Sequence, residues 1–269
     1  MKKMKLLFKK LVLALALATA WIGLAVPGHA DEMDEILKRG ELRIAVQTQG
    51  PPASFVDKNG KRTGLVIDLA QMMADDLGVK LVIQDYDWKA LIPALLAGKV
   101  DMIAADMTPS PQRAAQLLFS RPMFYQDTIA FTRTDMPFKT FSDANVEGKT
   151  VGTTQASSYG AAAKKFMPKA THKEFAGGTA AVAQAVSAGR VDSGVSDIAN
   201  INNFVKEFGN LRILDGVLTR EPLAFAVQPS HFHLKMWLDN YIELISADRR
   251  LDALVQYWWN SSDWEKDHK

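Results

Sequence analysis

The sequence predicts an α/β protein built as two lobes of similar construction, and three observations support that prediction. Apolar stretches of strand length alternate with stretches of helical spacing, a pattern typical of mostly parallel sheets flanked by helices. This alternation starts afresh near residue 149. One phrase also occurs twice, as "AGKVDMIAAD" at residues 97–106 and as "AGRVDSGVSD" at residues 188–197. We therefore expect one helix–turn–strand unit to recur in each lobe.

The first thirty residues predict a signal peptide. Five lysines without an acidic residue precede an apolar run of about sixteen residues, "LVLALALATAWIGLAV", and small residues follow at Gly28 and Ala30. The run is short for a membrane span, which needs roughly twenty residues, so we expect residues 1–30 to be cleaved after Ala30. Loss of the five lysines changes the formal net charge from +2 to −3.

The composition narrows the possible functions of the mature chain. A weakly acidic protein gives no reason to expect nucleic acid as a partner. The absence of cysteine excludes disulfides, Cys-based zinc sites, a Cys nucleophile and a lipid-modified Cys. We expect neither a metal nor a cofactor. Because an exported chain without a lipid anchor needs an outer boundary to retain it, we expect a Gram-negative periplasm.

The first lobe is predicted to begin with a short helix that ends at Gly40. Asn59 and Gly60 indicate a hairpin turn that needs positive φ. Pro93 costs least in the first turn of a helix, and we expect it there. The further elements predicted from periodicity and stop signals are strands at 42–47, 80–86 and 100–106, a hairpin at 56–64, and helices at 65–78 and 88–98.

The second lobe repeats this alternation. Two extended segments, 127–133 and 223–229, are expected to cross between the lobes and form a two-strand hinge around a cleft. Helices at 231–247 and 251–259 then return to the first lobe. We thus assign residues 31–127 and 229–269 to lobe 1 and residues 128–228 to lobe 2. The elements predicted within the second lobe are strands at 149–155, 172–175, 191–197 and 211–217, and helices at 157–166, 179–189 and 198–208.

The two repeated phrases place acidic residues at both ends of their strands. Asp106 and Asp197 end the strands, where ligands bind in open α/β sheets. Asp101 and Asp192 begin the strands, and we interpret them as turn or cap residues.

The segment "DMTPSPQRAAQLLFSRPMFY" at 106–125 predicts an anion site. Thr108 and Ser110 lie in a loop after a buried strand, and Pro111 starts a helix with Arg113 in its first turn. A guanidinium there is suited to grip a carboxylate bidentately. The alternative is a surface arginine on a solvated helix.

A second anion site is predicted in "TTQASSYG" at 153–160. Ser157 and Ser158 stand at a helix N-terminus, where N–H groups and the helix dipole favour an anion; on their own they are more typical of an N-cap. A carboxylate between Arg113 and this turn, with an ammonium facing Asp197, would pair both charges of an α-amino acid.

The chain resembles the type-II periplasmic solute-binding proteins for polar amino acids, which are receptors of ABC importers. The resemblance covers essentially the whole mature chain and rests on "GLVIDLAQMMADDLG", "WKALIPALLAGKVDMI", "MTPSPQRAAQLLFSRPMFY", "VGTTQASSY" and "GRVDSGVSD". It implies that Thr108 and Arg113 hold the ligand carboxylate with the backbone at Ser158. It also implies that Asp197 takes the amino group and that Trp88 stacks on the ligand, although Trp88 alone is slightly more typical of core packing. The resemblance further implies that the protein is a monomer and has two partners, an amino-acid ligand and an inner-membrane ABC permease.

The chain departs from the family pattern in places that bear on the ligand. Gly50 and Ala53 stand where relatives carry aromatic residues, which predicts a missing wall and room for a larger ligand side chain. Asp106 stands where relatives mostly have Gly, Ser or Asn; it either enters the cleft and favours a cationic ligand or caps the following turn. Gln47 replaces an acid that cation-binding relatives often carry, which weakens the prediction of a basic ligand.

An enzyme is the alternative function. A periplasmic cyclohexadienyl or arogenate dehydratase branch shares this fold, and the tail "YWWNSSDWEKDHK" is similar to it. Its general acid is a Glu in the second-lobe turn, where this chain has Ser158, Tyr159 and Gly160. Tyrosine, with a pKa near 10, is a poor acid at neutral pH. We therefore expect no catalytic residue, and we interpret Trp258, Trp259 and Trp264 as a packed helix end. The sensor half of a membrane receptor is disfavoured because the sequence shows no second apolar span.

Overall fold

The computed structural model describes residues 31–48 and 50–269; the predicted signal peptide at residues 1–30 lies outside the described residues. Residues Glu32–Lys269 form one compact unit. Within the described residues, no helix is both long enough and apolar enough to cross a membrane.

Strands and helices alternate along this unit. The strands are β1 (Glu41–Val46), β2 (Phe55–Val56), β3 (Arg62–Thr63), β4 (Lys80–Asp85), β5 (Met102–Met107), β6 (Leu118–Phe119), β7 (Phe124–Arg133), β8 (Thr150–Thr154), β9 (Thr171–Phe175), β10 (Ser193–Asp197) and β11 (Leu211–Val227). The helices are α2 (Glu32–Arg39), α3 (Leu65–Leu77), α4 (Trp88–Leu96), α5 (Pro111–Ala114), α6 (Ser158–Phe166), α7 (Gly178–Ser187), α8 (Ile198–Phe208), α9 (Phe232–Ala247), α10 (Arg250–Val255) and α11 (Trp264–His268), with a π-helical turn at Gln256–Asn260.

One sheet runs through the unit in the order β4-β1-β5-β11-β7-β10-β8-β9, with β6 paired to β11. We call the group of β1–β6, α2–α5 and α9–α11 the first lobe, and the group of β8–β10 and α6–α8 the second lobe. Pairing is parallel for β4-β1-β5 and for β10-β8-β9. The predicted α/β class with mostly parallel pairing in each lobe is therefore confirmed.

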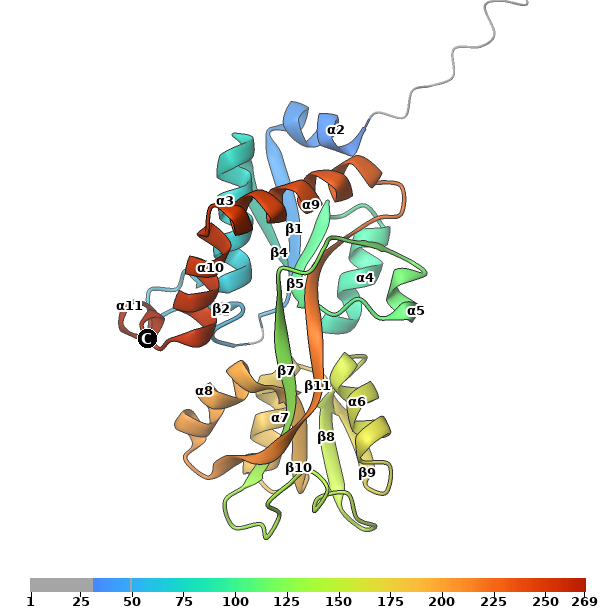
Figure 1. Ribbon diagram of the computed structural model, residues 1–269, viewed down its shortest axis with the longest axis vertical. Helices are drawn as coiled ribbons and strands as arrows, with labels where there is room; N and C mark the ends of the chain where they lie inside the picture. Colours follow the sequence, from blue (N-terminus) through green and yellow to red (C-terminus); the bar gives the residue numbers. More distant parts are fainter. Residues whose placement is uncertain (1–30, 49) are drawn as a thin grey trace, which may run out of the picture. The chain divides into compact units, whose positions relative to one another are not determined.

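The long strands β7 and β11 connect the lobes. They pair antiparallel with each other, and Figure 1 shows them side by side, running from the first lobe into the second. β5 of the first lobe adds to β11, and β10 of the second lobe adds to β7. Since neither long strand is interrupted between the lobes, the boundaries at 127/128 and 228/229 stay a prediction.

The repeated phrase produces equivalent structure in the two lobes. Helices α4 and α7 each end two residues before a glycine in the left-handed region, Gly98 with φ +68° and Gly189 with φ +70°. Each glycine N–H donates back to its helix, to the carbonyls of Leu95 and Val186, at 2.9 Å. Strands β5 and β10 follow directly, so the expected recurrence is confirmed.

Two element predictions are wrong. Pro93 lies inside α4 rather than in its first turn. It is exposed, and so is Lys89 four residues before it, so the carbonyl that loses its donor can be solvated. The segments 211–217 and 223–229 are not separate strands but parts of β11, which absorbs the irregular middle through register shifts between Ile213 and Thr219.

The C-terminal segment packs onto the first lobe. Trp258 and Trp264 are fully or almost fully buried beside Phe55, and the indole N–H of Trp258 donates to Asp68 at 2.9 Å. Trp259 packs edge-on against Phe124. The interpretation of these tryptophans as a packed helix end is confirmed.

Candidate functional site

The carboxyl end of β5 turns sharply into a loop. Asp106 is buried and has φ +46°, a left-handed conformation that costs Asp less than most residues. Two residues later, the hydroxyl of Thr108 donates to the Glu221 carboxylate at 2.7 Å. Glu221 belongs to the crossing strand β11 and is itself buried.

Helix α5 presents Arg113 to the second lobe. Ser110 caps the helix by accepting from the Arg113 N–H, and Pro111 is its first residue, as predicted. The Arg113 guanidinium donates to the Thr108 carbonyl at 2.9 Å and to the Ala156 carbonyl at 3.1 Å. Burial lowers the pKa of Arg113, and the Glu221 carboxylate opposes that shift. Arg113 is thus a buried cation rather than a surface arginine.

The turn before α6 meets Arg113 from the second lobe. Ser157 is the N-cap of α6 and accepts from the Gly160 N–H, while its hydroxyl donates to the Thr154 carbonyl at 2.6 Å. Ala156 precedes it with φ +58°. This conformation presents the Ala156 carbonyl to Arg113 and to the indole N–H of Trp88, which donates at 3.2 Å.

Asp197 is enclosed by its own lobe. It is 0% exposed and caps α8 by accepting from the backbone and side-chain N–H groups of Asn200 at 2.8 to 3.0 Å. The Tyr159 hydroxyl also donates to it, at 3.1 Å. Burial raises the pKa of Asp197 despite these hydrogen bonds. Burial, together with the charges of Asp197 and Asp106, raises the pKa of Tyr159 well above its ordinary value.

Most of the predicted site residues surround one cavity between the lobes. This space, the site cavity, is lined by Trp88, Asp106, Thr108, Thr154, Ser157, Ser158 and Tyr159. Arg113 and Asp197 do not line it. The Arg113 guanidinium is hydrogen-bonded to the carbonyls of Thr108 and Ala156, and Asp197 lies behind Tyr159. The ligand contacts expected of all seven predicted residues stay predictions.

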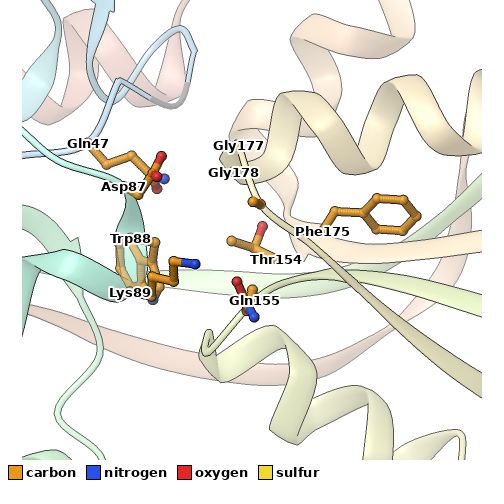
Figure 2. A pocket seen from close by; sticks show the side chains of 10 residues that line it. Gln47, Asp87, Trp88, Lys89, Thr154, Gln155, Phe175, Gly177 and Gly178 are labelled. Carbon is orange, nitrogen blue, oxygen red and sulfur yellow. The ribbon is translucent and has the colours of Figure 1, made fainter.

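A second space adjoins the site cavity and shares Trp88 and Thr154 with it. Figure 2 shows Gln47 and Asp87 on one side of it and the glycines at 177 and 178 on the other. Gln47 is buried, and its Oε1 has no hydrogen-bond partner among the described residues. The second space therefore offers a buried acceptor next to an exposed carboxylate.

The aromatic wall of the pocket that was expected to be missing at Gly50 is supplied by a side chain of the second lobe. A Cβ atom added to Gly50 would lie 3.1 Å from the Phe204 ring, which α8 carries. The room predicted there for a larger ligand side chain is absent, because a side chain more than 150 residues away occupies it. No local pattern in the sequence could indicate this contact.

Sequence reasoning missed Glu221, Ala156 and the contact between Tyr159 and Asp197. Glu221 carried no clear signal, because it follows Thr219 and Arg220 in a polar stretch just before the apolar segment expected to cross between the lobes. Ala156 carried no signal, because alanine rarely adopts positive φ. Among the described residues, no group of three or more His, Cys, Asp or Glu side chains is arranged to hold a metal ion.

Known proteins share both the sequence pattern and the fold. Residues 42–261 match the family model of bacterial extracellular solute-binding proteins, family 3. ABC transporter arginine-binding protein 1 of Escherichia coli K12 is 24% identical over 93% of this chain and 99% of its own.

Two solved structures extend the comparison. The ancestral amino acid-binding protein AncCDT-1, described as a precursor of cyclohexadienyl dehydratase, is 34% identical with a TM-score of 0.78, over 84% of this chain and 99% of its own. A lysine-complexed ABC transporter binding component of Wolinella succinogenes is 29% identical with a TM-score of 0.78, over 85% and 99%. The chain has the fold of these type-II binding proteins, and it belongs to the bacterial extracellular solute-binding proteins of family 3.

Proposed function

We propose that this protein is the receptor of an ABC importer and that it binds a free amino acid with a cationic side chain between its lobes. Family membership supports the receptor function. An arginine-binding relative and a related structure in complex with lysine support a cationic amino acid as the ligand. The observation that carries the cationic class is that Asp106 lines the site cavity together with Trp88, Thr108, Ser157 and Ser158.

The α-amino and α-carboxylate groups of the ligand would each pair with one charged side chain of the site. Arg113, with the loop at Thr108 and the start of α6 at Ser157 and Ser158, holds the carboxylate. We assign the ammonium to Asp197, which a ligand reaches only past the Tyr159 side chain in front of it, and Trp88 packs against the ligand. Asp106 adds a further carboxylate to the lining of the site cavity, and a positive charge on the ligand side chain would be attracted to it.

The second space suits the distal end of such a side chain. Within the part of the chain that the structure describes, nothing donates to the buried Gln47 Oε1, and a guanidinium or ammonium carries donors only. Asp87 and Lys89, which also line this space, offset one another in charge.

Ligand capture works by closure of the two lobes about β7 and β11. Arg113 and Trp88 of the first lobe already contact Ala156 of the second, which supports a closed arrangement. A ligand that binds this arrangement more tightly than an open one shifts the equilibrium toward it. We further propose that the closed protein acts as a periplasmic monomer and is recognised by an inner-membrane permease.

Binding takes place without catalysis. The turn at Ser158, Tyr159 and Gly160 holds no carboxylic acid. The raised pKa of Tyr159 makes its hydroxyl an even poorer proton donor than a free tyrosine. We therefore do not propose the dehydratase activity.

A thermal-shift screen of residues 31–269 tests this function. At a thousandfold excess over its dissociation constant, a ligand stabilises the folded state by about 4 kcal/mol. We expect L-arginine or L-lysine to raise the melting temperature by several degrees, and neutral or acidic amino acids and prephenate to have little effect. The shift should disappear in Arg113→Ala and Asp197→Ala and persist in Arg190→Ala and Asp215→Ala, which change exposed residues. A shift with neutral amino acids alone would contradict the cationic class, and turnover of prephenate would contradict the absence of catalysis.

A further inference from the structure

Glu221 is a buried carboxylate on the strand that crosses between the lobes. Only 7% of it is exposed, and both of its oxygens accept hydrogen bonds from hydroxyl groups. Oε2 accepts from Thr108 at 2.7 Å, and Oε1 accepts from Thr219 at 2.8 Å. The proline that follows, Pro222, is tolerated because β11 has only β7 beside it there; its pairing with β5 begins at Ala224.

Glu221 is connected to Arg113 through Thr108. The Thr108 hydroxyl donates to Glu221, while the Thr108 carbonyl accepts from the Arg113 guanidinium at 2.9 Å. The two contacts use opposite ends of one residue, so the Glu221 carboxylate fixes the position of the carbonyl that orients Arg113. Thr108 lies between the end of β5 at Met107 and the start of α5 at Pro111, so its side-chain hydrogen bond helps to hold this loop.

In this arrangement the Thr108 hydroxyl cannot donate a hydrogen bond to a second acceptor. A hydroxyl has one proton to donate, and here the proton points to Glu221. A carboxylate ligand accepts hydrogen bonds but donates none, so it cannot share that proton without displacing Glu221.

We propose that Glu221 is a positioning residue of the ligand site, which holds Thr108 so that the Thr108 carbonyl orients Arg113 toward the ligand carboxylate. This inference rests on the proposed function. The Thr108 hydroxyl then acts on Glu221 and not on the ligand. A direct contact between the Thr108 hydroxyl and the ligand would predict the opposite response, because removal of Glu221 would release the hydroxyl to bind.

Calorimetric titration of L-arginine into Glu221 variants separates the two arrangements. Glu221→Leu removes both acceptors, and we expect the dissociation constant to rise about 10- to 100-fold, the usual range for loss of a contact that supports a charged group. Glu221→Gln keeps an amide oxygen for Thr108, and its dissociation constant should stay within about threefold of wild type. Glu207→Leu is the matched control, since Glu207 is an exposed glutamate on α8, and it should bind as wild type does.

A double-mutant cycle with Thr108→Val tests the connection through Thr108. Thr108→Val should weaken binding about as much as Glu221→Leu, and the double variant should be little weaker than either, since both remove the same contact. Thr108→Ser keeps the hydroxyl and should bind nearly as wild type does. Circular dichroism and urea midpoints verify folding; if Glu221→Leu does not fold, the comparison of Thr108→Val with Thr108→Ser carries the test.

Failure of this inference differs from failure of the proposed function. Absence of L-arginine binding by the wild type overturns the proposed function and this inference with it. Wild-type binding that is unchanged or tightened in Glu221→Leu overturns the positioning role alone. An equal loss in Glu221→Gln and Glu221→Leu also overturns it, because the charge and not the hydrogen bond would then matter.

Discussion

Asp101 and Asp192, the first acidic residues of the two repeated phrases, hold equivalent strands in place. Asp101 accepts from the Arg43 N–H of β1 at 2.7 Å, and Asp192 accepts from the Thr150 N–H of β8 at 2.8 Å. Asp101 also forms ion pairs with Arg39 and Arg43. Both are therefore anchors between neighbouring strands, which is more than the turn or cap role expected of them.

The pKa of Asp192 gives this anchor a defined pH dependence. Burial opposes its ionisation, but hydrogen bonds from Thr150 and Lys149 outweigh burial and lower the pKa. A carboxyl whose folded pKa is lowered stabilises the fold above its unfolded pKa of about 3.9, and this stability is lost as the pH falls through the folded pKa.

We expect Asp192→Asn to lower the free energy of unfolding by about 1 to 2 kcal/mol at pH 7, because the amide replaces one of two acceptor oxygens with a donor. Urea unfolding at pH 7 and near pH 3 measures the difference, which should shrink at the lower pH. Asp215→Asn changes an exposed aspartate and serves as the control. A difference independent of pH would contradict the role of the charge.

At the scale of elements, the glycines that end α4 and α7 are required by their backbone conformation. A Cβ added to Gly98 would meet only Gln228, at 3.9 Å, so space does not exclude a side chain there. The φ of +68° does, since the left-handed region costs a residue with a Cβ roughly 1 to 2 kcal/mol.

Gly98→Ala should therefore lower the free energy of unfolding by about 1 kcal/mol, while Gly98→Asn should lower it less, because asparagine tolerates the left-handed region. Urea titrations of the two variants beside wild type provide the comparison. Equal losses in both would show that something other than backbone conformation limits this position.

Element prediction succeeded where the signal is local and failed where it is not. The helix start at Pro111, the cap at Ser157 and the stops at Gly78 and Gly189 act within a turn or two of their own positions, and the sequence displays them directly. The continuity of β11 depends instead on pairing with β7, which overrides a glycine and a proline inside it.

The same distinction explains which parts of the site could be predicted. Arg113 could be placed at a helix start from its neighbours, but its contact with Ala156 joins residues 43 positions apart, and the contact of Thr108 with Glu221 joins residues 113 apart. Such pairs are created only when the lobes and crossing strands assemble. The sequence consequently supported the identity of the site residues better than their mutual contacts.

At the scale of the whole unit, α8 of the second lobe contacts the first lobe far from Arg113. Asn203 donates to the Pro51 carbonyl at 3.1 Å, and Lys206 pairs with Glu265 of α11 at 2.8 Å. Lys269 also donates to Asn203, at 3.2 Å. The C-terminal segment thus joins the two lobes, and under the proposed closure these contacts stabilise the ligand-binding form.

Reversal of one charge in the Lys206–Glu265 pair should shift that equilibrium. Lys206→Glu places two carboxylates together, so we expect the dissociation constant of L-arginine to rise about two- to threefold, the modest range for a pair whose lysine is 56% exposed. The double variant Lys206→Glu with Glu265→Lys restores opposite charges and should recover most of the affinity. Titrations at 50 and 500 mM salt provide a further check, because screening should reduce the single variant's defect. A defect that survives both the charge swap and high salt would mean that Lys206 acts through packing on α8, and the closure equilibrium would then depend on Asn203 and Phe204 rather than on this pair.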